Sequence, residues 1–196
     1  GIENLQAMAK RCRRNIVRMV HGVGAGHPGG SLSAIDMLTA LYGHRLRVDP
    51  TNPEWNERDR FIMSKGHASP GLYSILHERG FLTEDDLWTF RRLGGVCQGH
   101  VDMKWCPGVD FSAGSLGMGL SFGIGCSFAA SLDGSNRTSW VMLGDGELQE
   151  GQVWEAVMSA VHHEISNLKV IVDRNRIQND DFCEAQMRIF DVSEKF

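Results

Sequence analysis

The spacing of apolar residues predicts several helices separated by glycine-rich loops. A first amphipathic helix is expected over residues 2–20, because apolar side chains recur every three to four positions: Ile2, Leu5, Met8, Cys12, Ile16 and Val20. The segment HGVGAGHPGG breaks this pattern. Ser33 then stands three residues before Asp36, the spacing of a capping box, so a second helix is expected to begin there. Thr83 and Asp86 repeat this spacing, and helical patterns also cover residues 72–80 and 152–162.

Three short apolar runs predict strands at residues 61–63, 139–143 and 168–172. Because these strands alternate with helices, the connections between them are expected to be right-handed crossovers, which give parallel pairing. The sequence therefore predicts an α/β fold, a parallel sheet with helices on both faces. We expect residues 1–196 to form one domain whose sheet is incomplete at the C-terminus, because no closing strand follows residue 180.

The uncharged segment AGSLGMGLSFGIGCSFAASL, residues 113–132, has the length of a membrane span. It contains five glycines and four serines, which make it a poor candidate for insertion into lipid. We interpret it as a buried helix that its small residues allow to pack closely.

Composition and charge exclude several classes of function. The chain has 196 residues, 42% of them hydrophobic, and a formal net charge of -4, so it has no bulk attraction for nucleic acid or an acidic membrane. Its five cysteines are odd in number and form no CxxC pair, which argues against a disulfide framework and a zinc site. A cytoplasmic location fits this cysteine usage.

An aspartate lies between two glycines at the end of the second predicted strand, in the order Gly144, Asp145, Gly146. Asn175 follows the next strand thirty positions later. Ligands of parallel α/β sheets bind at the carboxyl ends of the strands, and carboxylate and amide oxygens suit Mg²⁺ or Ca²⁺. The flanking glycines allow the backbone to approach a phosphate. Alone, the Asp-Gly pair would indicate an ordinary turn, but the matching Asn175 favours a metal site.

Five ordered motifs resemble the N-terminal part of the transketolase family. They are GHPGGSLSAIDMLTALY, RDRFIMSKGHASPGLYSIL, GGVCQGHVDM, SAGSLGMGLSFGIG and GDGELQEGQVWEAV…NLKVIVDRNRIQ. The last is similar to the thiamine diphosphate signature, which opens with Gly-Asp-Gly and closes with a loop that contains Asn. The resemblance covers residues 8–178.

The resemblance implies a set of cofactor and metal residues. The Asp145 carboxylate, the Asn175 side chain and the Ile177 carbonyl would hold Mg²⁺, for which Ca²⁺ could substitute, and this ion would bind the diphosphate of the cofactor. The cofactor itself would lie against backbone at Gly114, Ser115, Leu116, Gly144 and Gly146. Glu150 would join a hydrogen-bonded network between paired active sites, with a solvated first-turn glutamate as the alternative.

Three of the eight histidines, His27, His67 and His100, lie in Gly-His loops at the ends of predicted elements. The resemblance places them around the reactive part of the cofactor. We assign His27 and His100 to substrate hydroxyls and proton transfer, and His67 to the cofactor phosphate. The implied reaction transfers a two-carbon ketol unit from a ketose phosphate to an acceptor.

The family's pyrimidine-binding domain has no counterpart in these 196 residues. The resemblance therefore implies that this chain alone is inactive and that a second, C-terminal transketolase subunit supplies the missing domain in an α2β2 heterotetramer, unless the chain is a fragment of a longer one. Val101 and Met118 depart from the usual pattern, which leaves a specialised transferase with a non-sugar acceptor as an alternative. A non-catalytic assembly subunit is a further alternative. A nicotinamide-binding domain is disfavoured, because no strand precedes GSLGMG.

Overall fold

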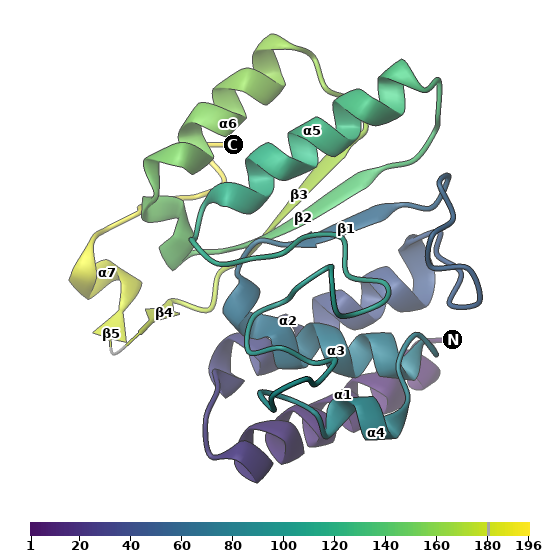
Figure 1. Ribbon diagram of the computed structural model, residues 1–196. Coiled ribbons are helices and arrows are strands. Elements are labelled where there is room, and N and C mark those ends of the chain that lie inside the picture. Colours follow the sequence, from purple (N-terminus) through teal and green to yellow (C-terminus); the bar gives the residue numbers. More distant parts are fainter. Residues whose placement is uncertain (180) are drawn as a thin grey trace. The chain divides into compact units, whose positions relative to one another are not determined.

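The chain crosses between two folding units at residues 59–60, 65–66 and 114–115 (Figure 1). A computed structural model describes residues 1–179 and 181–196. Unit 1 comprises residues 1–59 and 66–114, and unit 2 comprises residues 60–65 and 115–196. That residues 1–196 form one cofactor-binding domain stays a prediction.

Unit 1 is built on three helices that pack against one another: α1 (Ile2–Val23), α2 (Pro28–Ala40) and α3 (Ser69–Glu78). A π-helical turn, η1 (Leu41–Arg45), continues α2, and a 3-10 turn, η2 (Gly66–Ala68), leads into α3. The short helix α4 (Glu84–Leu87) follows. Its Thr83 and Asp86 form the predicted capping box. The core contains Cys12, Ile16 and Leu38, all fully buried.

The predicted start of the second helix is wrong. Helix α2 begins at Pro28, with His27 as its N-cap, and Ser33 lies inside the helix. Proline is favoured in the first turn of a helix because its fixed φ suits the helix and it has no N–H group to leave unbonded. The capping-box spacing at Ser33 was therefore misleading, since the helix had already begun before that point.

Unit 2 contains a parallel sheet of three strands, as predicted: β1 (Arg60–Met63), β2 (Ser139–Gly144) and β3 (Leu168–Asp173). The order is β1-β2-β3, with Phe61 opposite Trp140 and Val141 opposite Val170. After β3 the chain forms an antiparallel pair, β4 (Ile177–Gln178) and β5 (Asp181–Phe182), and then a helical turn, α7 (Cys183–Gln186).

Helix α5 (Met118–Leu132) packs on the sheet through small residues, as expected, but only one of its faces is buried and the helix begins five residues later than the segment interpreted as a buried helix. A Cβ atom on Gly123 would lie 2.4 Å from Val141 Cγ2, and one on Gly119 would lie 2.5 Å from the Ser64 side chain. Glycine is thus required at both positions for the helix to approach the sheet this closely. Within the described residues, no helix is both long and apolar enough to span a membrane.

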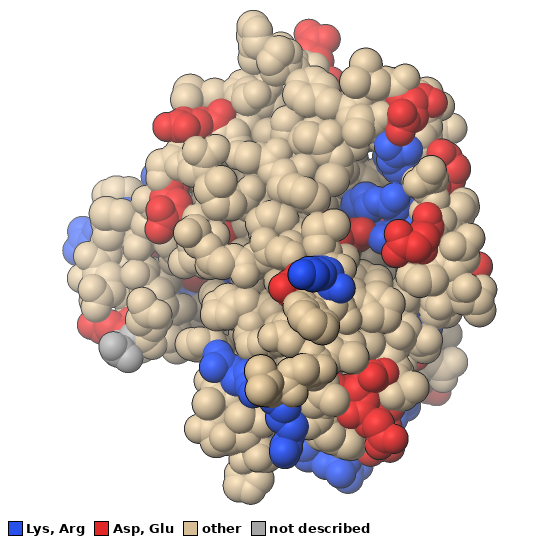
Figure 2. Space-filling model, viewed as in Figure 1, with Lys and Arg blue, Asp and Glu red and all other residues tan. Residues whose placement is uncertain are grey.

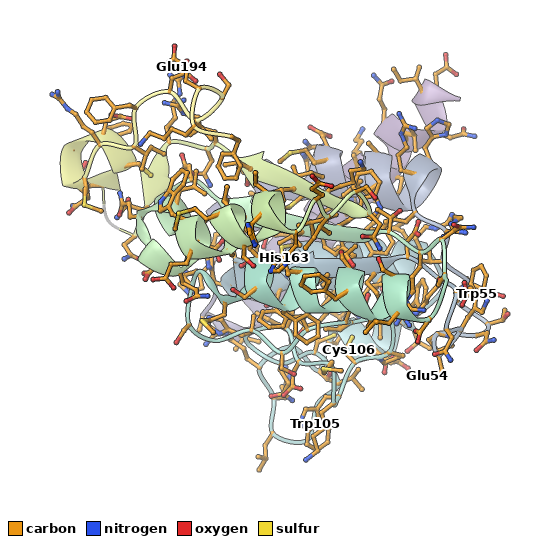
Figure 3. The ribbon with its side chains drawn as sticks, turned by 90° about the horizontal axis from the view of Figure 1, so that it is seen from above. Glu54, Trp55, Trp105, Cys106, His163 and Glu194 are labelled. Atoms are coloured by element: carbon orange, nitrogen blue, oxygen red, sulfur yellow. The ribbon has the colours of Figure 1, made fainter. Side chains whose placement is uncertain are left out.

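Helix α6 (Gly151–His162) packs against α5, and the 3-10 turn η3 (Gly146–Gln149) links it to β2. His163, labelled in Figure 3, packs edge-on against Phe128 of α5, with ring centroids 5.3 Å apart. The face that α5 and α6 present in Figure 2 carries few charged side chains. We call it the α5–α6 face. Its exposed large apolar residues are Met118, Phe122, Phe128, Leu132, Met158 and Val161.

Candidate functional site

The three predicted histidines form one cluster in unit 1. The ring centroid of His27 lies 5.4 Å from that of His67 and 6.4 Å from that of His100, and both pairs meet edge to face. His27 is exposed and the other two are half-buried. Sequence reasoning therefore identified three side chains that the fold brings together from three separate loops.

Side-chain hydroxyls of α3 hold the backbone of the loop that carries His100. The Tyr73 hydroxyl donates to the carbonyls of Gln98 and His100 at 3.0 and 3.2 Å, and the Ser69 hydroxyl donates to Gly99 at 2.8 Å. Further along the same loop, Trp105 projects outward (Figure 3). Because Tyr73 and Ser69 both belong to α3, this helix holds the backbone from which the His100 side chain extends.

The loop is anchored at its far end by a buried ion pair. Arg58 donates to both carboxylate oxygens of Asp110, at 2.9 and 2.6 Å. Such a two-bond pair is geometrically specific, since the planar guanidinium matches the carboxylate. Residues 98–110 are therefore held by side chains at both ends.

Burial lowers the pKa of His100, and the nearby Arg91 and His27 lower it further. All three effects disfavour the imidazolium form. The surroundings of His100 therefore favour the neutral imidazole, which can accept a proton as well as donate a hydrogen bond.

Asp145 lies directly after β2 in unit 2, and only 2% of its surface is exposed. Its Oδ1 accepts a hydrogen bond from the Gly146 N–H at 2.9 Å, and its Oδ2 accepts one from the Arg176 N–H at 2.6 Å. Among the described residues, no Lys, Arg or His side chain pairs with this carboxylate. Burying an unpaired charge is costly, so this donor set fits a bound cation.

The Asp145 carboxylate reaches the loop that contains the other two predicted ligands. The residue it contacts, Arg176, stands between Asn175 and Ile177, and the Asn175 Oδ1 accepts from the Ile177 N–H at 2.9 Å. In the part of the chain that the structure describes, no three His, Cys, Asp or Glu side chains are placed to hold a metal. A cation beside Asp145 would therefore need amide, carbonyl and diphosphate oxygens, which suits Mg²⁺.

The other residues predicted to contact the cofactor or a partner are either exposed or closely packed. Gly114, Ser115 and Leu116 are exposed, the first at the end of unit 1 and the other two at the start of unit 2. A Cβ atom on Gly146 would lie 2.9 Å from Gln178 Cβ. Glu150 is the exposed N-cap of α6 and makes no side-chain cap, so neither of its two interpretations is decided.

Two buried features of unit 2 were missed by sequence reasoning. Glu147 accepts hydrogen bonds from the Ser64 hydroxyl and from the N–H groups of Gly117 and Gly144, at 2.5, 2.8 and 2.9 Å. Its pKa is raised by burial, against the opposing effect of these bonds and of Lys65. Lys65 forms a buried ion pair with Asp173. In the sequence, the one local sign of these contacts is that Glu147 follows Gly146 and Lys65 precedes Gly66, so each charged residue is next to a glycine of a motif.

Comparisons with known proteins agree on one family. A family model described as transketolase, thiamine diphosphate binding domain, matches residues 5–196. An apulose-4-phosphate transketolase subunit of Phocaeicola vulgatus is 37% identical over 100% of this chain and 69% of its own length. A 6-deoxy-6-sulfo-D-fructose transketolase subunit of Clostridium sp. is 39% identical over 92% of this chain and 66% of its own length.

Longer proteins match over a smaller share of their length. Human transketolase is 34% identical over 99% of this chain, which spans 31% of the human protein. Among solved structures, transketolase from Campylobacter jejuni superposes with a TM-score of 0.90 and 36% identity, and covers 96% of this chain. The match confirms the predicted fold class.

Proposed function

The chain belongs to the transketolase family and contains its thiamine diphosphate-binding domain, and we propose that it is the diphosphate- and Mg²⁺-binding subunit of a two-component transketolase. With a partner subunit, this enzyme transfers a two-carbon ketol unit from a ketose donor to an acceptor. When bound, thiamine diphosphate stabilises the electron pair left by cleavage of the bond next to the ketose carbonyl.

The observation that supports this proposal best is the buried Asp145 carboxylate, which pairs with no cationic side chain among residues 1–179 and 181–196. We assign the Asp145 carboxylate, the Asn175 side chain and the Ile177 carbonyl as ligands of Mg²⁺, which would neutralise part of the charge of the cofactor diphosphate. Mg²⁺ usually combines one or two protein oxygens with phosphate oxygens and water. The backbone at residues 114–116, 144 and 146 would lie against the cofactor.

The histidine cluster supplies groups for binding a sugar and moving protons. We assign His27 and His100 to the substrate hydroxyls. We also assign His100, whose lowered pKa favours the neutral imidazole, as the acceptor of the hydroxyl proton that is lost when the C–C bond breaks. His67 is assigned to the cofactor phosphate. Glu150 is assigned to the contact between paired active sites.

A second subunit is part of the proposal for two reasons. Two similar proteins are named as subunits of transketolases. The α5–α6 face also exposes several large apolar side chains and few charged ones, as a surface that a protein partner covers would. We expect an α2β2 heterotetramer in a reducing cytoplasm, where four buried free cysteines would stay reduced.

The substrate class follows from the names of the relatives. One is named for apulose 4-phosphate and another for 6-deoxy-6-sulfo-D-fructose, both of them ketoses that carry an anionic group. We therefore propose an anionic ketose, such as a sugar phosphate, as the donor. A specialised transferase with a different acceptor remains the second candidate, supported by Val101 and Met118, which depart from the usual family pattern.

The test is cofactor content and activity with and without the partner subunit. We expect a heterotetramer that retains thiamine diphosphate and Mg²⁺, and that releases an aldose product from a ketose phosphate. The chain without its partner should bind inorganic diphosphate with Mg²⁺ and show no turnover. Stoichiometric retention of thiamine diphosphate by this chain alone would disprove the need for a partner.

Replacing His100 by asparagine should lower kcat by about 10²- to 10⁴-fold, the usual contribution of a general base. Cofactor affinity should stay within about twofold, since the assignment gives His100 no phosphate contact. In the parent enzyme, activity should fall on the acid side with an apparent pKa below about 6.5, because the fold disfavours the imidazolium.

The matched control for this substitution is His44→Asn, which changes an exposed histidine of the π-helical turn η1. It should leave both kcat and the pH profile unchanged. A His100→Asn enzyme with parental kcat would remove this residue from the mechanism.

A further inference from the structure

Glu147 connects two segments of unit 2 that are far apart in sequence. One carboxylate oxygen accepts from the Gly117 N–H and the Ser64 hydroxyl, and the other accepts from the Gly144 N–H. The side chain is 2% exposed. Gly117 ends the 115–117 segment, and Gly144 begins the 144–146 turn. A single buried carboxylate therefore bonds directly to both.

These bonds also complete the start of α5. The N-cap residue, Gly117, has no side chain to cap the helix, and its φ of 82° places it in the left-handed region. The first turn of a helix leaves its N–H groups without partners inside the helix. Here Glu147 accepts from Gly117, and the Ser64 hydroxyl accepts from Gly119 at 3.1 Å. Residues from η3 and from the end of β1 thus replace the missing cap.

We propose that Glu147 is a positioning residue that fixes the 115–117 segment relative to the 144–146 turn, so that both present their backbone to the cofactor diphosphate in one geometry. This inference rests on the proposed function for the identity of the ligand. The bonds themselves do not depend on it.

The chemistry of the site favours a carboxylate over other side chains. An ionised carboxylate only accepts hydrogen bonds and has about four lone-pair sites, enough for three converging donors. A glutamine in its place would present an NH₂ group to one of those donors. An aspartate would be one methylene shorter, which would hold its oxygens closer to the backbone of η3. A buried carboxylate is costly in itself, and the three donors together with nearby Lys65 offset part of that cost.

The first test measures hydrogen exchange of the two glycine amides in the complete protein with its partner subunit. Glu147→Ala should accelerate exchange at both Gly117 and Gly144 by at least about tenfold, because each amide loses a hydrogen bond to a charged acceptor. Glu147→Gln, with one oxygen, should protect one of the two amides and release the other. Unchanged exchange at both amides in Glu147→Ala would overturn the proposal.

The second test measures thiamine diphosphate affinity at saturating Mg²⁺ in the same proteins. Glu147→Ala should raise the Kd by about 10- to 100-fold, the range seen when a supporting partner of a ligand site is removed. In Glu147→Gln, the apparent KM for cofactor should rise while kcat at saturating cofactor stays near the parental value. The control Glu155→Gln changes an exposed glutamate of α6 and should alter neither quantity.

The two tests separate failure of this inference from failure of the proposed function. Faster exchange with a parental Kd would mean that Glu147 joins the segments but does not serve the cofactor, which overturns the positioning role. If the parent assembly binds no thiamine diphosphate at all, the proposed function fails. In that case the proposed role of Glu147 toward the cofactor fails as well. Hydrogen exchange of the Gly117 and Gly144 amides still decides whether Glu147 holds the two segments together.

Discussion

Asp145→Asn should abolish Mg²⁺-dependent binding of thiamine diphosphate, with an increase in Kd of at least about a hundredfold. Removing only an outer partner of a metal ligand already costs about 10- to 100-fold, and this substitution removes the one charged oxygen assigned to the ion. The side chain keeps its size, so the loss would come from charge and not from a cavity. Calorimetric titration of the complete assembly, with and without Mg²⁺, measures it.

The stability of the cofactor-free protein separates a binding defect from misfolding. Asparagine can satisfy one of the two N–H groups that Asp145 now bonds, Gly146 or Arg176, but not both. We therefore expect a cost of only about 1–3 kcal/mol in the free energy of unfolding. Asp85→Asn, at an exposed position in α4, is the control. An unchanged cofactor Kd in Asp145→Asn would exclude Asp145 as the metal ligand.

Lys65→Met should lower the free energy of unfolding by about 3–5 kcal/mol, the usual cost of removing one partner of a buried ion pair. Lys65 is 1% exposed and pairs with Asp173 at the end of β3. Methionine fills most of the lysine stem, so packing changes little. What is lost is the positive charge between two buried carboxylates, those of Asp173 and Glu147. Urea unfolding followed by circular dichroism measures the change.

Two further variants test whether the loss comes from the unpaired charge. Lys65→Met combined with Asp173→Leu should recover much of the stability, because a buried pair can often be replaced by apolar residues at little cost. Lys169→Met, on an exposed position of β3, should change stability by less than about 0.5 kcal/mol. A Lys65→Met protein as stable as the parent would mean that the ion pair contributes nothing.

The elements of the fold were largely predictable, because their signals are local. The apolar runs that predicted β1 and β2 are buried in the observed sheet, and the Thr83 capping box formed where its spacing placed it. The start of α2 was not predicted, since two local signals competed and the proline at residue 28 prevailed over Ser33.

The sequence by itself determined the family, the parallel sheet and the positions of Asp145 and the three loop histidines, because each depends on residue type at a fixed local spacing. Only the tertiary structure decided which side chains meet. The partner of Lys65 lies 108 positions away, and Glu147 bonds to a glycine 30 positions before it. Such pairings leave no periodic trace in the sequence, since they arise only when the crossovers place the ends of β1, β2 and β3 side by side.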